Sequence, residues 1–196
     1  MIIKALIPIN KGKSKICLSN GTDFVLYKGD IKRYNIKEGY EITEEIYGLI
    51  FDTILIPRCR KRAMHLLEKQ DRTKENIRQK LKEGGYPDIV IDDAIEYLSS
   101  YHYLDDERYA NNYIRFHQDK KSKKRIAVDR MVKGVSKDII DRALEESFIN
   151  DEKEQILQLI EKKQYDKNFA TQQERAKMYR FLAYRGFSGE DILKHI

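Results

Sequence analysis

The sequence has 196 residues, of which 41% are hydrophobic and 36% are charged, and its formal net charge is +6. No run of about 18 apolar residues occurs, and the first residues lack the basic start and long apolar core of a secretory signal, so we expect no membrane contact. Cys17 and Cys59 stand apart without paired spacing, so we expect reduced thiols and a cytoplasmic protein.

The first forty or so residues have the pattern of β-strands. Short apolar or β-branched runs occur at Ile2–Ile7, Ile16–Leu18 and Phe24–Tyr27. Asn20-Gly21 between the last two runs predicts a two-residue hairpin turn, because both residue types tolerate positive φ. The sequence therefore predicts a small β-rich N-terminal segment over residues 1–42.

From Thr43 onward the apolar residues recur at helical spacing. Thr43 followed by Glu44 and Glu45 has the pattern of a helix N-cap with acidic residues in the first turn. Pro57 is expected to break or restart this helix. A basic group follows the proline, formed by Arg58, Arg60, Lys61 and Arg62.

An internal repeat organises the remaining chain. Three glycines, Gly85, Gly134 and Gly186, lie 49 and 52 residues apart, and each has matching apolar neighbours at fixed offsets. These neighbours are Ile77, Ile126 and Met178 eight residues before; Tyr86, Val135 and Phe187 one after; Ile91, Ile140 and Ile192 six after; and Ile95, Leu144 and Ile196 ten after. A glycine past a helix end takes the left-handed conformation, and the next hydrophobic residue folds back onto the last turn. Each glycine thus predicts a helix–turn–helix corner.

A third helix is expected before each helix pair. In the second copy it begins near Asp105-Asp106 and carries Tyr109, Tyr113 and Phe116 as one apolar stripe. The predicted fold class is mainly α, with tandem three-helix, helix-turn-helix-like repeats in an elongated curved array. The predicted repeats cover residues 43–102, 103–148 and 149–196.

The positive charge is concentrated between Arg108 and Lys133. Nine basic residues there face only Asp119 and Asp129, whereas the rest of the chain is nearly neutral. Such local basicity favours contact with a polyanion, and the alternative is a solvated linker between helices.

Several short segments together form a recognisable pattern. The most recognisable is Tyr103–Ala110, and the others are Arg62-Ala63, Leu66-Leu67, Arg72-Thr73 to Leu81 and Gly85, Arg125-Ile126 to Lys133-Gly134, and Tyr34, Ile36 and Gly39. In these segments the chain resembles the RecX family of regulators of the RecA recombinase. The likeness covers most of the chain and is weakest over the first thirty and last forty-five residues. Arg130 and Met131 depart from it, since the family has an acidic residue and a leucine there.

The resemblance implies a non-catalytic monomer that binds RecA filaments and the single-stranded or duplex DNA within them. It further implies modulation, chiefly inhibition, of recombinase and ATPase activity in DNA repair, recombination and the SOS response. Together with the basic clusters, it gives these candidate contacts to RecA or DNA: Arg58, Arg60, Lys61, Arg62, Arg72, Arg108, Arg115, Lys120, Lys121, Lys123, Lys124, Arg125, Arg130 and Lys133.

The residues give little support to catalysis. The four histidines share no metal-ligand spacing with each other or with the cysteines, and no glycine-rich phosphate loop occurs. Asp105-Asp106 fits a helix N-terminus better than an acid–base pair. We therefore expect no catalytic residues, cofactor or metal. Two other functions stay open, a helix-turn-helix transcription regulator and a nonspecific single-stranded DNA-binding protein.

Overall fold

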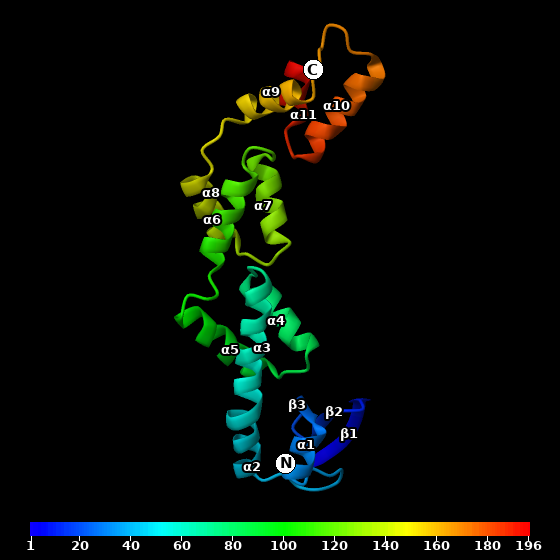
Figure 1. Cartoon of the computed structure of the whole chain (residues 1–196), viewed down its shortest axis with the longest axis vertical. Helices are drawn as coiled ribbons and strands as arrows, with labels where there is room; N and C mark the ends of the chain where they lie inside the picture. The colour runs from blue at the N-terminus through cyan, green and yellow to red at the C-terminus, as the bar shows by residue number, and fades with distance from the viewer. The chain divides into compact units, whose positions relative to one another are not determined.

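The computed structural model describes residues 1–196 as two compact units, Met1–Asp105 and Asp106–Ile196. It confirms a mainly helical fold with tandem three-helix repeats and a small N-terminal sheet (Figure 1). None of its helices is long and apolar enough to span a membrane. The repeat boundaries given above stay predictions.

The first unit contains three strands, a short helix and the first repeat. Its elements are β1 (Ile3–Asn10), β2 (Lys13–Leu18), β3 (Asp23–Tyr27), α1 (Lys28–Arg33), α2 (Glu44–Ile50), the π-helical turn η1 (Phe51–Leu55), α3 (Ile56–Lys69), α4 (Lys74–Glu83) and α5 (Asp88–Ser100). The second unit contains the other two repeats, made of α6 (Asp106–His117), α7 (Lys123–Met131), α8 (Lys137–Ser147), α9 (Glu152–Lys162), α10 (Gln172–Tyr184) and α11 (Gly189–His195).

The strands form an antiparallel sheet in the order β1-β2-β3. Alternate residues of β2 and β3, such as Ile16 and Phe24, are buried, as expected for a sheet with one covered face. The hairpin lies at the predicted place, but its turn is longer than two residues because the Leu18 N–H donates to the Thr22 carbonyl. Only Gly21 has a positive φ in this turn.

A continuous helix runs from α2 through η1 into α3 (Figure 1). Thr43 caps its start as predicted, since its side chain accepts a hydrogen bond from the Ile46 N–H. At Pro57 the helix restarts rather than breaks, because the regular α-helix α3 begins at Ile56 and has the proline in its first turn. The helix passes through a π turn just before the proline, and this wider turn relieves the clash that a proline ring makes in a regular α-helix.

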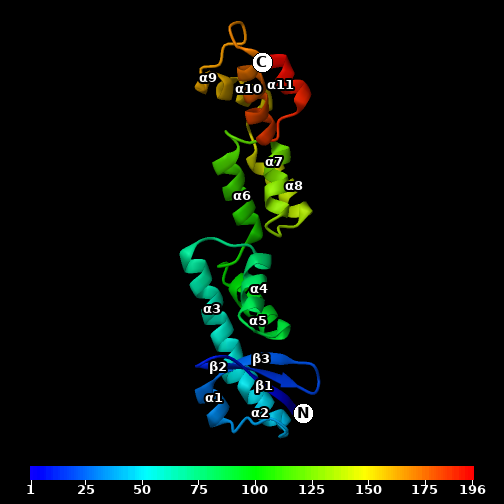
Figure 2. The same cartoon turned by 90° about the vertical axis from the view of Figure 1, so that its right-hand side faces the viewer.

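The sheet packs on the first half of this helix (Figure 2). The Phe24 ring of β3 meets the rings of Tyr47 and Phe51 edge-on, with centroids 6.5 and 5.6 Å apart. The sheet and the first repeat therefore share one hydrophobic core, whereas the second and third repeats each have a smaller core of their own.

The three glycine corners form as predicted. Gly85, Gly134 and Gly186 have φ values of +80°, +81° and +90°. The following residue turns back over the helix end, and the N–H groups of Tyr86 and Val135 donate to carbonyls five residues earlier. The matched isoleucines Ile91, Ile140 and Ile192 are all buried in the cores of their repeats.

Two of these corners touch a neighbouring element so closely that only glycine fits. A Cβ added to Gly85 would lie 2.3 Å from Cγ2 of Val25 in β3. A Cβ added to Gly186 would lie 2.5 Å from Cβ of Arg125 and 2.6 Å from Oγ of Ser122, which both belong to the second repeat. The glycines thus allow both a sharp turn and close packing.

The predicted apolar stripe of the second repeat is partly wrong. Tyr109 and Tyr113 are half-buried, but Phe116 is 70% exposed. Ala110 and Ile114 fill the core instead, because the face of α6 that meets α8 is one residue away from the aromatic stripe.

We predict that Gly85→Ala destabilises the chain more than Gly21→Ala. Both glycines have positive φ, which costs an alanine about 1–2 kcal/mol, but nothing lies within 4 Å of a Cβ added at Gly21. The clash with Val25 should add about 1–3 kcal/mol at Gly85. Urea unfolding of both variants measures the difference, and equal losses would contradict the close approach.

Candidate nucleic-acid interface

The basic stretch of the second repeat covers the end of α6, the loop after it and the start of α7. Ser122 is fully buried and caps α7 by accepting a hydrogen bond from the Arg125 N–H. The Glu152 side chain accepts a bond of 2.8 Å from the Lys123 N–H and so caps the same helix. These contacts fix the backbone that carries Lys123, Lys124 and Arg125.

Part of the basic stretch is held inward by Asp129. Lys121 Nζ lies 2.7 Å and Arg125 Nε 3.1 Å from its carboxylate, and the Tyr113 hydroxyl donates to it over 2.9 Å. Burial by itself raises the pKa of Asp129, but the hydrogen bonds from Lys121 and Tyr113 outweigh it and lower that pKa below its ordinary value. Lys121 is thus a structural cation.

Arg130 lies in the core of the second repeat, with only 4% of its surface exposed. Its guanidinium carbon is 3.3 Å from the centroid of the Tyr113 ring and 5.1 Å from that of Tyr109. The His117 ring packs on the Tyr113 ring with centroids 4.0 Å apart, and burial together with Lys121 and Arg130 lowers the pKa of His117. Arg130 therefore stabilises the repeat and is not available to a partner.

The remaining cations of the stretch point outward. Lys120, Lys123 and Lys124 are exposed and form no ion pair. Lys120 lies 5.3 Å above the exposed Phe116 ring, and Lys123 lies 5.1 Å from the Phe148 ring. The candidates Arg108, Arg115 and Lys133 are also exposed.

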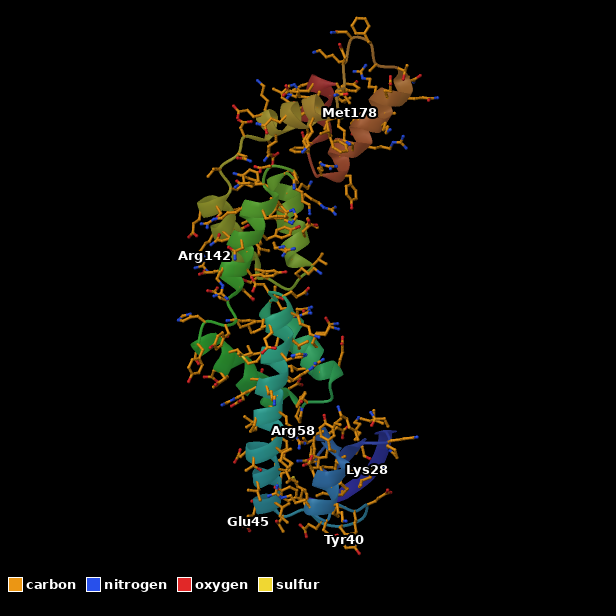
Figure 3. All side chains as sticks on the ribbon, viewed as in Figure 1. Lys28, Tyr40, Glu45, Arg58, Arg142 and Met178 are labelled. Carbon is orange, nitrogen blue, oxygen red and sulfur yellow. The ribbon has the colours of Figure 1, made fainter.

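In the first repeat, three of the candidates have internal partners. Arg58, labelled in Figure 3, forms a bidentate ion pair with Asp30 of α1. Arg60 pairs with Asp93 at 2.7 and 2.8 Å. Arg72 donates to Asn76 over 2.7 Å and to the Leu66 carbonyl.

Lys61 and Arg62 are the exposed candidates next to these pairs. Three exposed candidates, Lys120, Lys123 and Lys124, lie within five residues at the start of α7, which is the largest such group.

Two groups of aromatic residues lie beside the candidate cations. Tyr97, Tyr101 and Tyr103 form a ladder with centroids 4.9 and 6.2 Å apart, and Arg60 lies 4.2 Å above the first ring. Tyr184 of α10 lies beside Arg125, although 59 residues separate them in the sequence. Such a pairing across repeats gives no local sequence signal.

No group of three or more His, Cys, Asp or Glu side chains is arranged to hold a metal ion. Burial raises the pKa of the Cys59 thiol to about 12, so it is a packing residue of α3.

Comparison with known proteins identifies the family. Three family models match this chain: the first three-helix domain of RecX at residues 59–98, the second at 105–144 and the third at 150–196. The regulatory protein RecX of Clostridium botulinum (strain Eklund 17B / Type B) is 30% identical over 95% of this chain and 89% of its own length.

The chain belongs to the RecX family. A crystal structure of regulatory protein RecX matches with a TM-score of 0.57 and 23% identity, and covers 100% of this chain and 98% of the other. A crystal structure of RecX from Lactobacillus salivarius matches with a TM-score of 0.59 and 25% identity, over 71% of this chain and 93% of the other. The RecX resemblance of the sequence is thereby confirmed.

The two departures from the RecX pattern noted above now have different explanations. Arg130 fills a core position by stacking on Tyr113 and Tyr109, while Asp129 binds the neighbouring cations. Met131 is about half exposed, and nothing in its surroundings explains the substitution.

We predict that Asp129→Asn lowers the stability of the second repeat at neutral pH. The folded state lowers the pKa of Asp129, so its charged form contributes stability above the ordinary carboxyl pKa, and this contribution is lost as the pH falls through the lowered value. Urea midpoints of wild type and variant should therefore differ at pH 7 and converge as the pH falls below the lowered pKa of Asp129. Asp141→Asn, at an exposed position of α8, is the control. A difference independent of pH would contradict the ion cluster.

Proposed function

We propose that this chain is a non-catalytic regulator that binds RecA–DNA filaments and modulates, chiefly inhibits, their recombinase and ATPase activities. Membership of a family whose curated relatives are named regulatory proteins supports a regulatory role. With DNA as part of the partner, repair and recombination in the cytoplasm are the proposed setting.

The proposal rests on one observation: some cations of the basic stretch have an internal partner, and others are exposed. Lys121 and Arg125 bind Asp129, so the loop before α7 is held in one conformation while Lys120, Lys123 and Lys124 remain exposed. A solvated linker would need no such support. A fixed group of cations matches the regularly spaced phosphates of DNA or the acidic side chains of a protein filament.

Tandem repeats also suit a helical filament. Several weak contacts on one chain raise the effective concentration of each, so no single contact has to be strong. A bound regulator changes filament behaviour only if it favours one state of the filament over another. Inhibition would follow if the chain bound a less active arrangement of RecA protomers more tightly.

A helix-turn-helix transcription regulator is the weaker alternative. Its recognition helix would be the last helix of a repeat, which enters the major groove. In the first repeat this helix, α5, carries Asp88, Asp92 and Asp93, which pair with cations of their own repeat. Acidic residues on that helix oppose approach to phosphates.

We predict that this protein lowers the rate of ATP hydrolysis by RecA on single-stranded DNA and shortens the lifetime of the filaments. Replacing Lys120, Lys123 and Lys124 by Ala should weaken the inhibition and flatten the salt dependence. Each lost phosphate contact on a single strand removes about 0.7 from the slope of log affinity against log salt, so the slope should fall by up to about 2.

A matched control removes the same charge elsewhere in the second unit. Lys137, Lys153 and Lys162 are exposed, and their replacement by Ala should leave inhibition unchanged. Unaltered hydrolysis, strand exchange and filament lifetime at saturating wild-type protein would refute the proposed function. Equal losses in both triple variants would mean that only net charge matters. Binding to DNA with no effect on RecA would favour the single-stranded DNA-binding alternative.

A further inference from the structure

The second and third repeats meet where α10 ends on the start of α7. The Ser122 N–H donates to the Arg185 carbonyl over 3.0 Å. Gly186 follows directly and lies against Ser122 and Arg125 with no room for a side chain. The last turn of α10 is therefore fixed beside the first turn of α7.

This contact places an exposed aromatic ring beside the basic residues at the start of α7. Tyr184, the last residue of α10, is 72% exposed. The guanidinium carbon of Arg125 lies 5.1 Å from the centroid of its ring, and Asp129 holds that guanidinium in place at 3.1 Å. The ring has a cation on one side and is otherwise open to solvent, so it contributes little to the core.

Two exposed lysines belong to the same helical turn as Arg125. Lys123 and Lys124 precede Arg125 and are exposed. The nearby carboxylates already have partners, since Asp129 binds Lys121 and Arg125, and Glu152 accepts from the Lys123 N–H. Asp119, in the loop before α7, accepts a bond of 2.6 Å from the Asn150 side chain.

We propose that Tyr184 and Arg125 form a stacking site for one unpaired base of single-stranded DNA, and that Lys123 and Lys124 bind the adjacent phosphates. Exposed aromatic rings among cations are the usual platform for single strands, because every base has a flat face. The planar guanidinium of Arg125, held by Asp129, packs on the ring and fixes its position. A duplex does not fit this chemistry, because its bases are stacked inside. The site deepens the proposed function by naming the form of DNA that is bound.

The first test measures binding of fluorescein-labelled oligodeoxythymidine to the full chain without RecA, by fluorescence anisotropy. Tyr184→Ala should weaken binding about tenfold, within the range known for loss of one base–aromatic stack. Tyr184→Phe keeps the ring and should bind within about twofold of wild type. If Tyr184→Ala binds like wild type, or Tyr184→Phe loses as much as Ala, the stacking site is refuted.

Phe169 provides the matched control. It is 85% exposed and precedes α10, whose 13 residues separate it from Tyr184 by about 20 Å. Phe169→Ala should leave the affinity for oligodeoxythymidine unchanged. An equal loss in this variant would show that any exposed aromatic of the repeat serves, which would overturn the assignment to Tyr184.

A second test reads the stack directly. The sequence contains no Trp, so Tyr184→Trp introduces a single indole reporter. Oligodeoxythymidine should quench its emission, whereas an abasic oligonucleotide of equal length and a polyglutamate peptide should not. Equal quenching by either would mean that the surface binds anions or acidic protein segments without stacking, and the inference would fail.

These measurements use no RecA. Quenching by oligodeoxythymidine together with unchanged RecA hydrolysis would therefore refute the proposed function and leave the stacking site standing. Inhibition of RecA that survives Tyr184→Ala unchanged, with no quenching in the Trp variant, would refute the stacking site and leave the proposed function standing.

Discussion

The structure depends on glycine at the corner of each repeat. A three-helix unit of this size has a thin core, so it gains stability from neighbouring elements, and in two repeats such a neighbour comes close to the turn between two helices. At Gly85 and Gly186 the positive φ makes the turn, and the missing side chain admits Val25 in one case and Ser122 with Arg125 in the other. The same residue type therefore solves a local and a tertiary problem at once.

The consequence for function is clearest at Gly186. Because the turn presses against α7, the chain brings together Arg125 of the second repeat and Tyr184 of the third. One repeat supplies the cation of this pair and the other supplies the ring. The repeated fold positions the helices, and residues that differ between the copies, such as Arg125 and Tyr184, form the candidate site.

The sequence predicted the parts of the fold that follow local rules. The periodic apolar residues and the glycine offsets predicted the repeats, and Thr43 predicted a helix start, because caps and left-handed turns depend on a few adjacent residues. It failed at Phe116, and at Pro57 it left open whether the helix breaks or restarts. The π turn before the proline involves the backbone of five residues and not one residue type, and the face of α6 that is buried depends on where α8 packs.

The candidate contacts show the same limit. From the sequence, Lys121, Lys124 and Arg130 are equivalent candidates. In the structure Lys121 binds Asp129, Lys124 is exposed, and Arg130 is stacked on Tyr113 in the core. Sequence gives the charge of a side chain but not its partner, and the partner decides whether the charge is available. An arginine at position 130 is thus compatible with the repeat. Its guanidinium packs in the core on the rings of Tyr109 and Tyr113, which lie one helical turn apart on α6. The exposed cations at the start of α7 lie on a backbone that Ser122 and Glu152 fix by capping the helix. Because this backbone is fixed, the Tyr184 ring that packs on Arg125 has a defined position beside it.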